Sequence, residues 1–137
     1  MSSHKDLVKP LKKLSKTSKA KLCDVGCFFV KNGAIISSGV NHNPTGGPME
    51  KEVDSKLVSL PEVIHAEMSA INSAKKNNVD LAGSTLMITM SPCINCAKEI
   101  IKTGIVELNY MYEWWDKASI ELLEKNGIKV KKIEEEK

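Results

Sequence analysis

Two short segments of this 137-residue chain carry side chains that commonly bind metals. The first is His65-Ala66-Glu67, and the second is Pro92-Cys93-Ile94-Asn95-Cys96. One imidazole and two thiols make three ligands, the number that a catalytic zinc uses when its fourth tetrahedral position stays open for water. A structural zinc needs a fourth ligand, and the sequence has no second Cys-x-x-Cys pair to supply one. Together the segments predict a catalytic metal site with His65, Cys93 and Cys96 as ligands.

Each segment alone has a simpler interpretation. A histidine at a helix start is often a capping or core residue, and a lone Cys-x-x-Cys can be a redox pair or half of a structural zinc site.

The Cys-x-x-Cys spacing places both sulfurs on one turn at a helix N-terminus, where unpaired N–H groups and the helix dipole favour thiolates. Glu67, two residues beyond His65, is poorly placed to bind the same metal but close enough to reach a water on it. Glu67 is therefore the candidate proton carrier.

The elements that must position these residues follow from hydrophobic periodicity and turn signals. The strands and helices after residue 60 alternate, so their connections should be right-handed crossovers and the last three strands parallel. The expected fold is a single α/β domain over residues 1–137, a three-layer αβα sandwich with a mixed five-stranded sheet. The sequence predicts a basic helix in 1–22, strands at 25–31 and 34–40 joined by a hairpin at 32–33, a long loop to about residue 60, a helix at 65–76, a strand at 84–90, a helix to 103, a strand at 106–112, a helix at 117–126, a strand at 128–133 and an acidic tail at 134–137.

Charge is concentrated at the N-terminus. All 20 basic residues are lysines against 17 acidic residues, and seven of the lysines lie in residues 1–22. A nucleic-acid-binding arm is one interpretation of this segment. However, Leu7, Leu11 and Leu14 fall at helical spacing, and the segment lacks arginine and interleaved aromatic residues, which favours a packed helix with a solvated lysine face. Without arginine, any phosphate must be bound by lysine, backbone N–H groups or hydroxyls.

Targeting signals and cysteine content bound the cellular context. The sequence shows neither a signal peptide nor an apolar run long enough to span a membrane, so we expect a soluble cytoplasmic protein. Its compact length and lack of arginine are typical of a virus or another AT-rich genome, in which case the location is the host cytoplasm. The uneven spacing of four cysteines favours metal or catalytic chemistry over a disulfide framework.

The two metal-binding segments together match the H-x-E…P-C-x-x-C signature of zinc-dependent nucleobase deaminases. From about residue 21 to residue 133 the chain resembles the cytidine deaminase superfamily and, within it, the deoxycytidylate (dCMP) deaminases, including those encoded by phages. The resemblance rests on the stretches CDVGCFFVKNGAIISSGVN, PEVIHAEMSAI and SPCINCAKEIIKTGIVELNYMY. The last stretch discriminates most, because deaminases of this type typically follow their zinc cysteines with C-A-K-x-I-I-x-x-G-I.

This resemblance implies hydrolytic deamination of dCMP to dUMP and ammonia, which supplies thymidylate synthesis. His65, Cys93 and Cys96 correspond to the ligands of one catalytic Zn²⁺ per chain, and Glu67 to the general acid and base. The resemblance also implies a homohexamer, regulation by the effectors dCTP and dTTP, and Mg²⁺ bound with an effector nucleotide. The sequence has Gly39-Val40-Asn41-His42 where the family usually has G-Y-N-G, and this departure weakens the expectation of regulation.

Substrate contacts also follow from the resemblance. Asn41 matches the asparagine of the G-Y-N-G loop, and the backbone at Ala66 and Ser91 resembles the groups that hold the base. Lys21 precedes the first strand, where relatives often carry a basic residue, and is the candidate for the 5′-phosphate. The family often has aromatic residues near the substrate around the fourth strand, although packing or a subunit contact explains them equally well. Those aromatic residues are Tyr110, Trp114 and Trp115.

Three alternatives remain open from the sequence. A deaminase of polynucleotide bases, such as the wobble adenosine of tRNA, uses the same zinc set, but the residues after Cys96 and the lack of arginine oppose it. A zinc-stabilised binding module would leave Glu67 without a role. Some phage relatives hold a second, structural zinc, for which the alternative is ordinary buried thiols. The candidate ligands of that second zinc are Cys23, Cys27 and His42.

Overall fold

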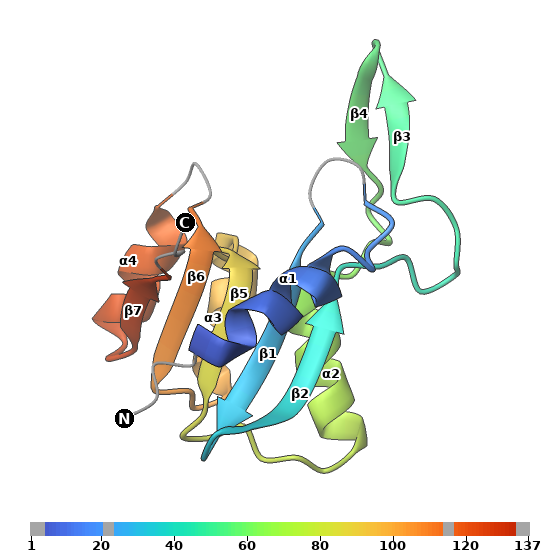
Figure 1. Ribbon diagram of the computed structural model, residues 1–137. Helices are drawn as coiled ribbons and strands as arrows, with labels where there is room; N and C mark the ends of the chain where they lie inside the picture. The colour runs from blue at the N-terminus through green and yellow to red at the C-terminus, as the bar shows by residue number, and fades with distance from the viewer. Residues whose placement is uncertain (1–4, 21–23, 114–116, 134–137) are drawn as a thin grey trace.

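The computed structural model describes residues 5–20, 24–113 and 117–133 (Figure 1). Its helices are α1 (Val8–Ser15), which follows a 3₁₀ turn at Lys5–Leu7, α2 (Ala66–Lys76), α3 (Ile94–Lys102) and α4 (Ala118–Lys125). Its strands are β1 (Gly26–Lys31), β2 (Ala34–Val40), β3 (Glu50–Val53), β4 (Lys56–Ser59), β5 (Thr85–Met90), β6 (Glu107–Tyr112) and β7 (Lys129–Lys132). The predicted acidic tail at 134–137 lies outside the described residues.

Five of the strands form one mixed sheet in the order β2-β1-β5-β6-β7. β1 pairs antiparallel with both β2 and β5, whereas β5, β6 and β7 are parallel. The two residues between β1 and β2, Asn32 and Gly33, both have positive φ, as a tight two-residue hairpin requires. The predicted hairpin on one side of the sheet and the three parallel strands are confirmed.

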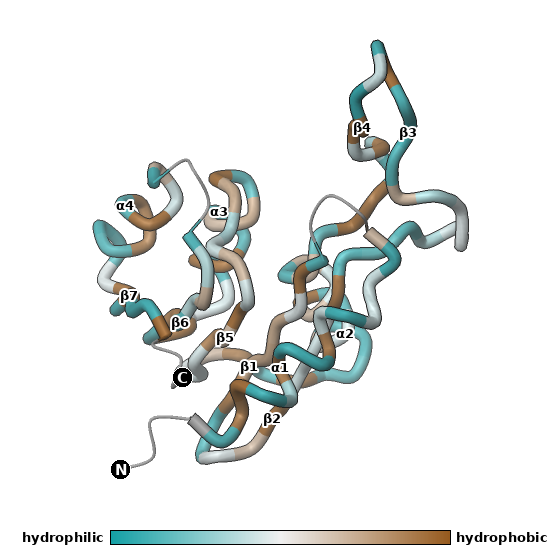
Figure 2. The backbone as a smooth tube through the Cα atoms, turned by 45° about the horizontal axis from the view of Figure 1, so that its top comes forward, coloured by the Kyte–Doolittle hydropathy of each residue, from teal (hydrophilic) through white to brown (hydrophobic). Residues whose placement is uncertain are grey.

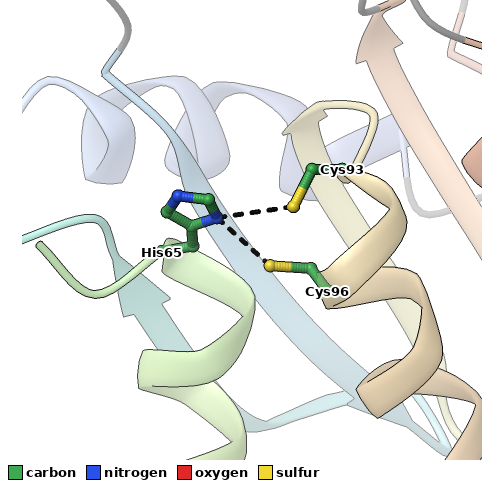
Figure 3. Close-up of side chains that lie close together, drawn as sticks. All are labelled: His65, Cys93 and Cys96. Carbon is green, nitrogen blue, oxygen red and sulfur yellow. Dashed lines mark hydrogen bonds between the residues drawn. The ribbon is translucent and has the colours of Figure 1, made fainter. Parts of the chain in front are cut away.

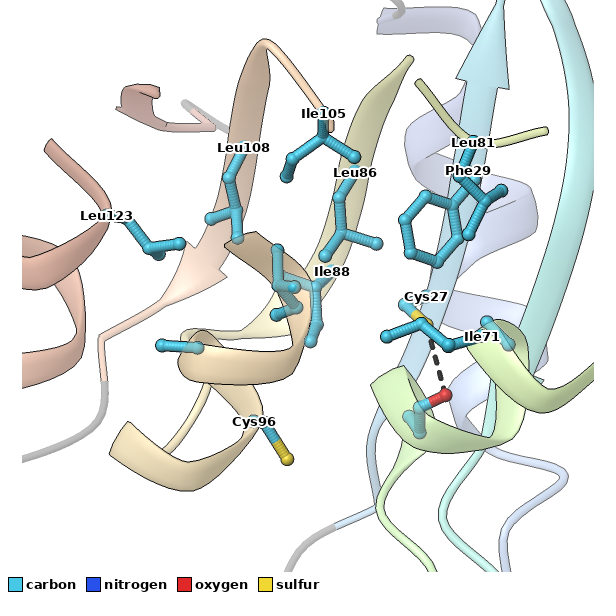
Figure 4. Packing of buried hydrophobic residues seen from close by; sticks show 14 of the residues in the cluster. Cys27, Phe29, Ile71, Leu81, Leu86, Ile88, Cys96, Ile105, Leu108 and Leu123 are labelled. Atoms are coloured by element: carbon cyan, nitrogen blue, oxygen red, sulfur yellow. Dashed lines mark hydrogen bonds between the residues drawn. The ribbon is translucent and has the colours of Figure 1, made fainter. Parts of the chain in front are cut away.

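Helices cover both faces of the sheet, so the predicted three-layer αβα arrangement is confirmed. Successive residues of β1 point to opposite faces. Phe29 packs with α2, α3 and α4 in the larger core (Figure 4). Phe28 packs against α1 on the other face. Apolar residues run along β1 and β5, whereas hydrophilic residues are frequent in α1 (Figure 2).

The lysine-rich N-terminal segment is a packed helix over its described part. Leu11 is fully buried against the sheet, while Lys9, Lys13 and Lys16 are exposed. The helix ends at Ser15, earlier than the sequence predicted, and the chain then turns toward the sheet edge, where the hydroxyl of Ser18 donates to the Asn41 carbonyl at 3.0 Å. The prediction of a packed helix with a solvated lysine face therefore holds for this part.

The prediction of a continuous loop up to residue 60 is wrong, because this segment contains the β3–β4 hairpin. The two strands pair antiparallel around Asp54 and Ser55, which have φ of 50° and 65°. Asp-Ser lacks the glycine that makes such turns recognisable in a sequence, so the turn signal is weak. The hairpin is exposed along nearly all of its length and extends away from the sheet (Figure 1).

One edge of the sheet gathers the predicted site residues. β2 and β5 run in the same direction, so Asn41 after β2 and Ser91 after β5 lie at the same edge. The N-termini of α2 and α3 reach that edge as well. The carboxyl ends of strands are the usual ligand-binding edge of α/β sheets. Within the described part of the chain, no helix is long and apolar enough to cross a membrane.

Candidate active site

His65, Cys93 and Cys96 come together as the sequence predicted (Figure 3). The Nδ1 atom of His65 lies 3.2 Å from the sulfur of Cys96 and 3.7 Å from that of Cys93. A tetrahedral zinc with Zn–N and Zn–S bonds of ordinary length holds its ligand atoms about 3.5 Å apart. The donor set and its spacing therefore fit zinc. Among the described residues, this is the one group of three or more His, Cys, Asp or Glu side chains close enough to share a metal.

Two helix starts position the ligands. His65 and Cys93 are the N-cap residues of α2 and α3, and both have extended backbone. Neither side chain caps its own helix, so each is available to the site, and Cys96 joins them from the first turn of α3. The unpaired N–H groups and dipoles of both helix starts favour negative charge there. A two-residue bridge between His42 and Ile64 fixes the chain immediately before His65.

The three ligands share protons in the metal-free protein. Hydrogen bonds from Cys96 and then His65 lower the pKa of Cys93 to about 4. The hydrogen bond to Cys93 raises the pKa of Cys96, and burial adds to that effect. The pKa of His65 is also raised, chiefly by its hydrogen bond with Cys93. A metal that binds here must therefore displace protons from Cys96 and His65.

Glu67 is the buried acid of the site, with only 4% of its surface exposed. Burial raises its pKa to about 7, although a hydrogen bond from its own backbone N–H and the nearby His65 act in the opposite direction. A carboxyl group with a pKa near neutrality can both accept and donate a proton at physiological pH. The predicted role of Glu67 as proton carrier requires such a group.

A pocket of about 250 Å³ opens beside these residues. It brings together three of the predicted substrate-binding residues, Asn41, Ala66 and Ser91, as well as Glu67 and the metal ligands His65 and Cys93. The side-chain oxygen of Asn41 accepts a hydrogen bond from the Val25 backbone N–H at 3.0 Å, which holds this residue at the rim. The other lining residues, which the sequence did not reveal, are Ala20, Val25, Met49, Glu50, Ser59, Val63 and Met90.

Three of these unforeseen lining residues belong to the base of the β3–β4 hairpin. Glu50 and Ser59 are paired across its first rung, and Met49 precedes them. They were missed because the segment was interpreted as a loop. The available signal was weak, because it consisted only of the polar pair Asp54-Ser55 between two short segments.

Among the described residues, Tyr110 is a predicted substrate residue that does not line the pocket. Tyr110 is buried in the core, and its hydroxyl donates to Glu113 at 3.4 Å. Lys21, Trp114 and Trp115 lie outside the described residues. For the second zinc, Cys27 and His42 belong to no group of three or more candidate ligands within the described part of the chain, and Cys23 lies outside that part. Cys27 is a buried thiol, as the alternative interpretation holds.

Comparisons with known proteins agree with this geometry. The family described as the cytidine and deoxycytidylate deaminase zinc-binding region matches residues 1–112. The chain is 30% identical to an uncharacterized deaminase in the luxG 3′ region of Aliivibrio fischeri, covering 82% of this chain and 81% of that protein. It is also 30% identical to the deoxycytidylate deaminase of Enterobacteria phage T2, with 76% of each covered.

A solved structure extends the comparison to three dimensions. The crystal structure of the dCMP deaminase from the cyanophage S-TIM5, in complex with dCMP and dUMP, superposes with a TM-score of 0.87. That enzyme is 30% identical, and the alignment covers 97% of this chain and 99% of the other. Because the family match includes the histidine, glutamate and both cysteines of the site, the chain belongs to the cytidine and deoxycytidylate deaminase family.

Proposed function

We propose that this protein is a zinc-dependent hydrolase that converts dCMP to dUMP and ammonia and so supplies thymidylate synthesis. One observation carries the proposal: a His, Cys, Cys donor set and a buried glutamate converge on one pocket. The likeness to a dCMP deaminase crystallised with its substrate and product supports dCMP as the substrate.

The roles of the residues follow from their placement. His65, Cys93 and Cys96 would hold the zinc ion, which when bound acts as a Lewis acid that activates water at neutral pH. Glu67 accepts one proton of the attacking water and delivers it to ring nitrogen 3 of cytosine, where it stays in the product. Glu67 then carries the second proton, from the hydroxyl group formed at carbon 4, to the amino group, so that ammonia leaves as the carbonyl of dUMP forms. The backbone at Ala66 and Ser91 holds the base, while apolar lining residues restrict access of bulk water.

The phosphate of dCMP must be bound by lysine, backbone N–H groups or hydroxyls, because the chain has no arginine. None of the described residues that line the pocket is a lysine, and two of them, Glu50 and Glu67, are acidic. Ala20 lines the pocket and Lys21 is the next residue in the chain. We therefore retain Lys21 as the proposed phosphate contact.

Assembly, regulation and location are proposed from the family resemblance. His65 is exposed, and a groove of about 540 Å³ lies beside it between α2 and α3. Homohexamer formation would be one way to shield such a site, which supports the proposed assembly. Regulation by dCTP and dTTP, with Mg²⁺ accompanying the effector, and a cytoplasmic location of the single-domain enzyme complete the proposal.

A substrate panel tests the function. Ammonia release is measured with cytidine, dCMP, dCTP and a short RNA, each with and without added dCTP or dTTP, and the mass of the protein is measured in solution. We expect turnover of dCMP that a zinc chelator abolishes. Deamination of the RNA without turnover of dCMP would favour the polynucleotide deaminase instead.

A further inference from the structure

Helix α2 carries both His65 and Glu67, and two buried side chains of the sheet donate hydrogen bonds to its backbone. The thiol of Cys27 on β1 donates to the Ala66 carbonyl at 3.3 Å, drawn as the dashed line in Figure 4. The hydroxyl of Ser37 on β2 donates to the Ala70 carbonyl at 2.8 Å. These two carbonyls lie one helical turn apart, so the two strands hold successive turns of α2.

The helix does not need these bonds to satisfy its own backbone. Ala66 and Ala70 lie within α2, and a helical carbonyl that already accepts the N–H of residue i+4 has a second lone pair for a side-chain donor. The side-chain bonds therefore add a constraint between helix and sheet. That constraint opposes movement of α2 along its axis, because the two acceptor carbonyls, of Ala66 and Ala70, lie at different heights along the helix.

The surface between α2 and the sheet contains few large side chains that would resist sliding of the helix. The helix faces the sheet with Ala66, Ala70 and Ala74, which are all buried and small. On the sheet side, a Cβ added at Gly39 would lie 2.5 Å from the Ala66 carbonyl oxygen. Large side chains normally interdigitate at such contacts and fix the register. Here Ile71 is the one large apolar side chain among the buried residues of α2, and it packs in the same cluster as Phe29 of β1.

The connections that lead into α2 and α3 differ in length. Only Ser91, Pro92 and Cys93 separate β5 from α3, so the sheet positions the cysteines directly. By contrast, α2 follows residues 41–65, which include the exposed β3–β4 hairpin. The His42–Ile64 bridge holds the chain just before α2, and the contacts of the helix with the sheet must supply the rest of its axial position.

We propose that Cys27 and Ser37 are positioning residues for the deamination, an inference that rests on the proposed function. Their hydrogen bonds set the axial position and rotation of α2. That placement brings the His65 ring to the two cysteine sulfurs of α3 and the Glu67 carboxyl group to the pocket. A shift of α2 along its axis would separate both side chains from their partners together.

The test compares Cys27→Ala and Ser37→Ala with a matched control in the full-length zinc protein. The control is Ser84→Ala, because Ser84 is also fully buried and donates to a backbone carbonyl, that of Leu81, at 2.6 Å. Ser84 precedes β5 at the end opposite Ser91, away from the start of α2. The measurements are kcat and KM for dCMP, Tm, and the absorption bands of the Co²⁺-substituted protein, which report the arrangement of the metal ligands.

We expect each test variant to lower kcat about tenfold, with KM within about twofold of the wild type, and to shift the Co²⁺ bands. Cys27→Ser and Ser37→Thr keep a donor and should restore most of kcat and the wild-type bands. Ser84→Ala should lower Tm but leave kcat and the bands unchanged.

The inference is overturned if the test variants behave like Ser84→Ala, losing Tm alone, or if the donor-retaining variants fail to restore the wild-type bands. Should the wild type not deaminate dCMP, the proposed function fails. The Co²⁺ bands would then still decide whether Cys27 and Ser37 position the metal ligands, so the two failures are distinguishable.

Discussion

His65 and Glu67 are two residues apart, yet their environments give them different chemistry. His65 precedes the first turn of α2 with extended backbone, and its ring reaches the sulfurs of Cys93 and Cys96. Glu67 lies inside the first turn and is buried, so its carboxyl group is desolvated and its pKa rises to about 7. A proposed metal ligand and the proposed proton carrier thus come from one helix start.

Replacing Glu67 tests the proton-transfer role directly. Glu67→Gln keeps the size of the side chain but removes the group that accepts and donates the proton. We expect kcat for dCMP to fall by about 10²–10⁴-fold, the usual contribution of a general acid and base. Zinc content, measured by atomic absorption, should remain at the wild-type level because Glu67 is not a ligand. An active Glu67→Gln enzyme would contradict the mechanism.

The same substitution, which should lower kcat, should stabilise the metal-free protein. The carboxyl group is neutral in the folded state up to about pH 7, but it ionises in the unfolded chain above its ordinary pKa of 4.5. The folded state therefore binds more protons in this window, and the free energy of unfolding falls as pH rises through it. In denaturant titrations, the free energy of unfolding of metal-free Glu67→Gln should be about 1–3 kcal/mol higher than that of the wild type at pH 8 and equal to it near pH 4. An equal difference at both pH values would show that ionisation of Glu67 is not the cause.

Lys21 is the residue proposed to bind the 5′-phosphate. A hydrogen bond to a charged group is commonly worth about 1.5–3 kcal/mol, so Lys21→Ala should raise KM for dCMP by about tenfold or more. Turnover of cytidine, which has no phosphate, should be unaffected. Lys19→Ala is the matched control from the same segment. An unchanged KM for dCMP in Lys21→Ala would mean that another group binds the phosphate.

The candidate ligands and Glu67 could be predicted from the sequence because they fall in two short segments. His65 and Glu67 lie within three consecutive residues, and Cys93 and Cys96 lie within four. A helix start fixes the relative positions of such neighbours, so the spacing alone carries the information. Cys27 and Ser37 could not be predicted in the same way. Their acceptors on α2 are 39 and 33 residues away in the chain, and only the docking of the helix brings them into contact.

At the scale of elements, the contact between α2 and β2 depends on the absence of a side chain at Gly39. A Cβ there would meet the Ala66 carbonyl oxygen at 2.5 Å and the Ala70 nitrogen at 2.6 Å, so the helix would have to move away. Gly39→Ala should therefore lower kcat by about 10²-fold, since a displacement near 1 Å in a catalytic group has that effect. It should also destabilise the fold by about 1–3 kcal/mol, the usual cost of overpacking.

The control for this variant is Ser38→Ala, at the adjacent exposed position of β2. It should leave kcat and Tm unchanged. A Gly39→Ala enzyme with wild-type kcat would show that α2 tolerates displacement, which would also weaken the positioning role of Cys27 and Ser37.

The sheet could be predicted from the sequence more completely than the segment between β2 and α2. Each sheet strand has either a strong turn signal or a helix beside it, and the crossover rule then determines the parallel order. The β3–β4 hairpin has neither, because Asp54 and Ser55 form its turn without glycine and both strands are exposed. Hydrophobic patterning cannot reveal strands that bury almost nothing.

At the scale of the whole molecule, zinc would join the starts of two helices that contact each other little. His65 directly precedes α2, which packs on β1 and β2, while Cys93 and Cys96 lie at the start of α3, which follows β5. A bound metal therefore stabilises the folded chain as a cross-link between helices. Because the pKa values of His65 and Cys96 are raised, binding releases protons, and the stabilisation must grow as pH rises.

The difference in Tm between the zinc-loaded and the chelator-treated protein should therefore widen from pH 6 to pH 8. Calorimetric titration of the metal-free protein with Zn²⁺ in buffers of different ionisation enthalpy should detect proton release in the same range. Cys96→Ser removes one thiol ligand, so its Tm difference should be small at every pH. A difference that stayed constant or narrowed in the wild type would mean that the ligands are already deprotonated, and the proton-sharing arrangement of His65, Cys93 and Cys96 would be wrong.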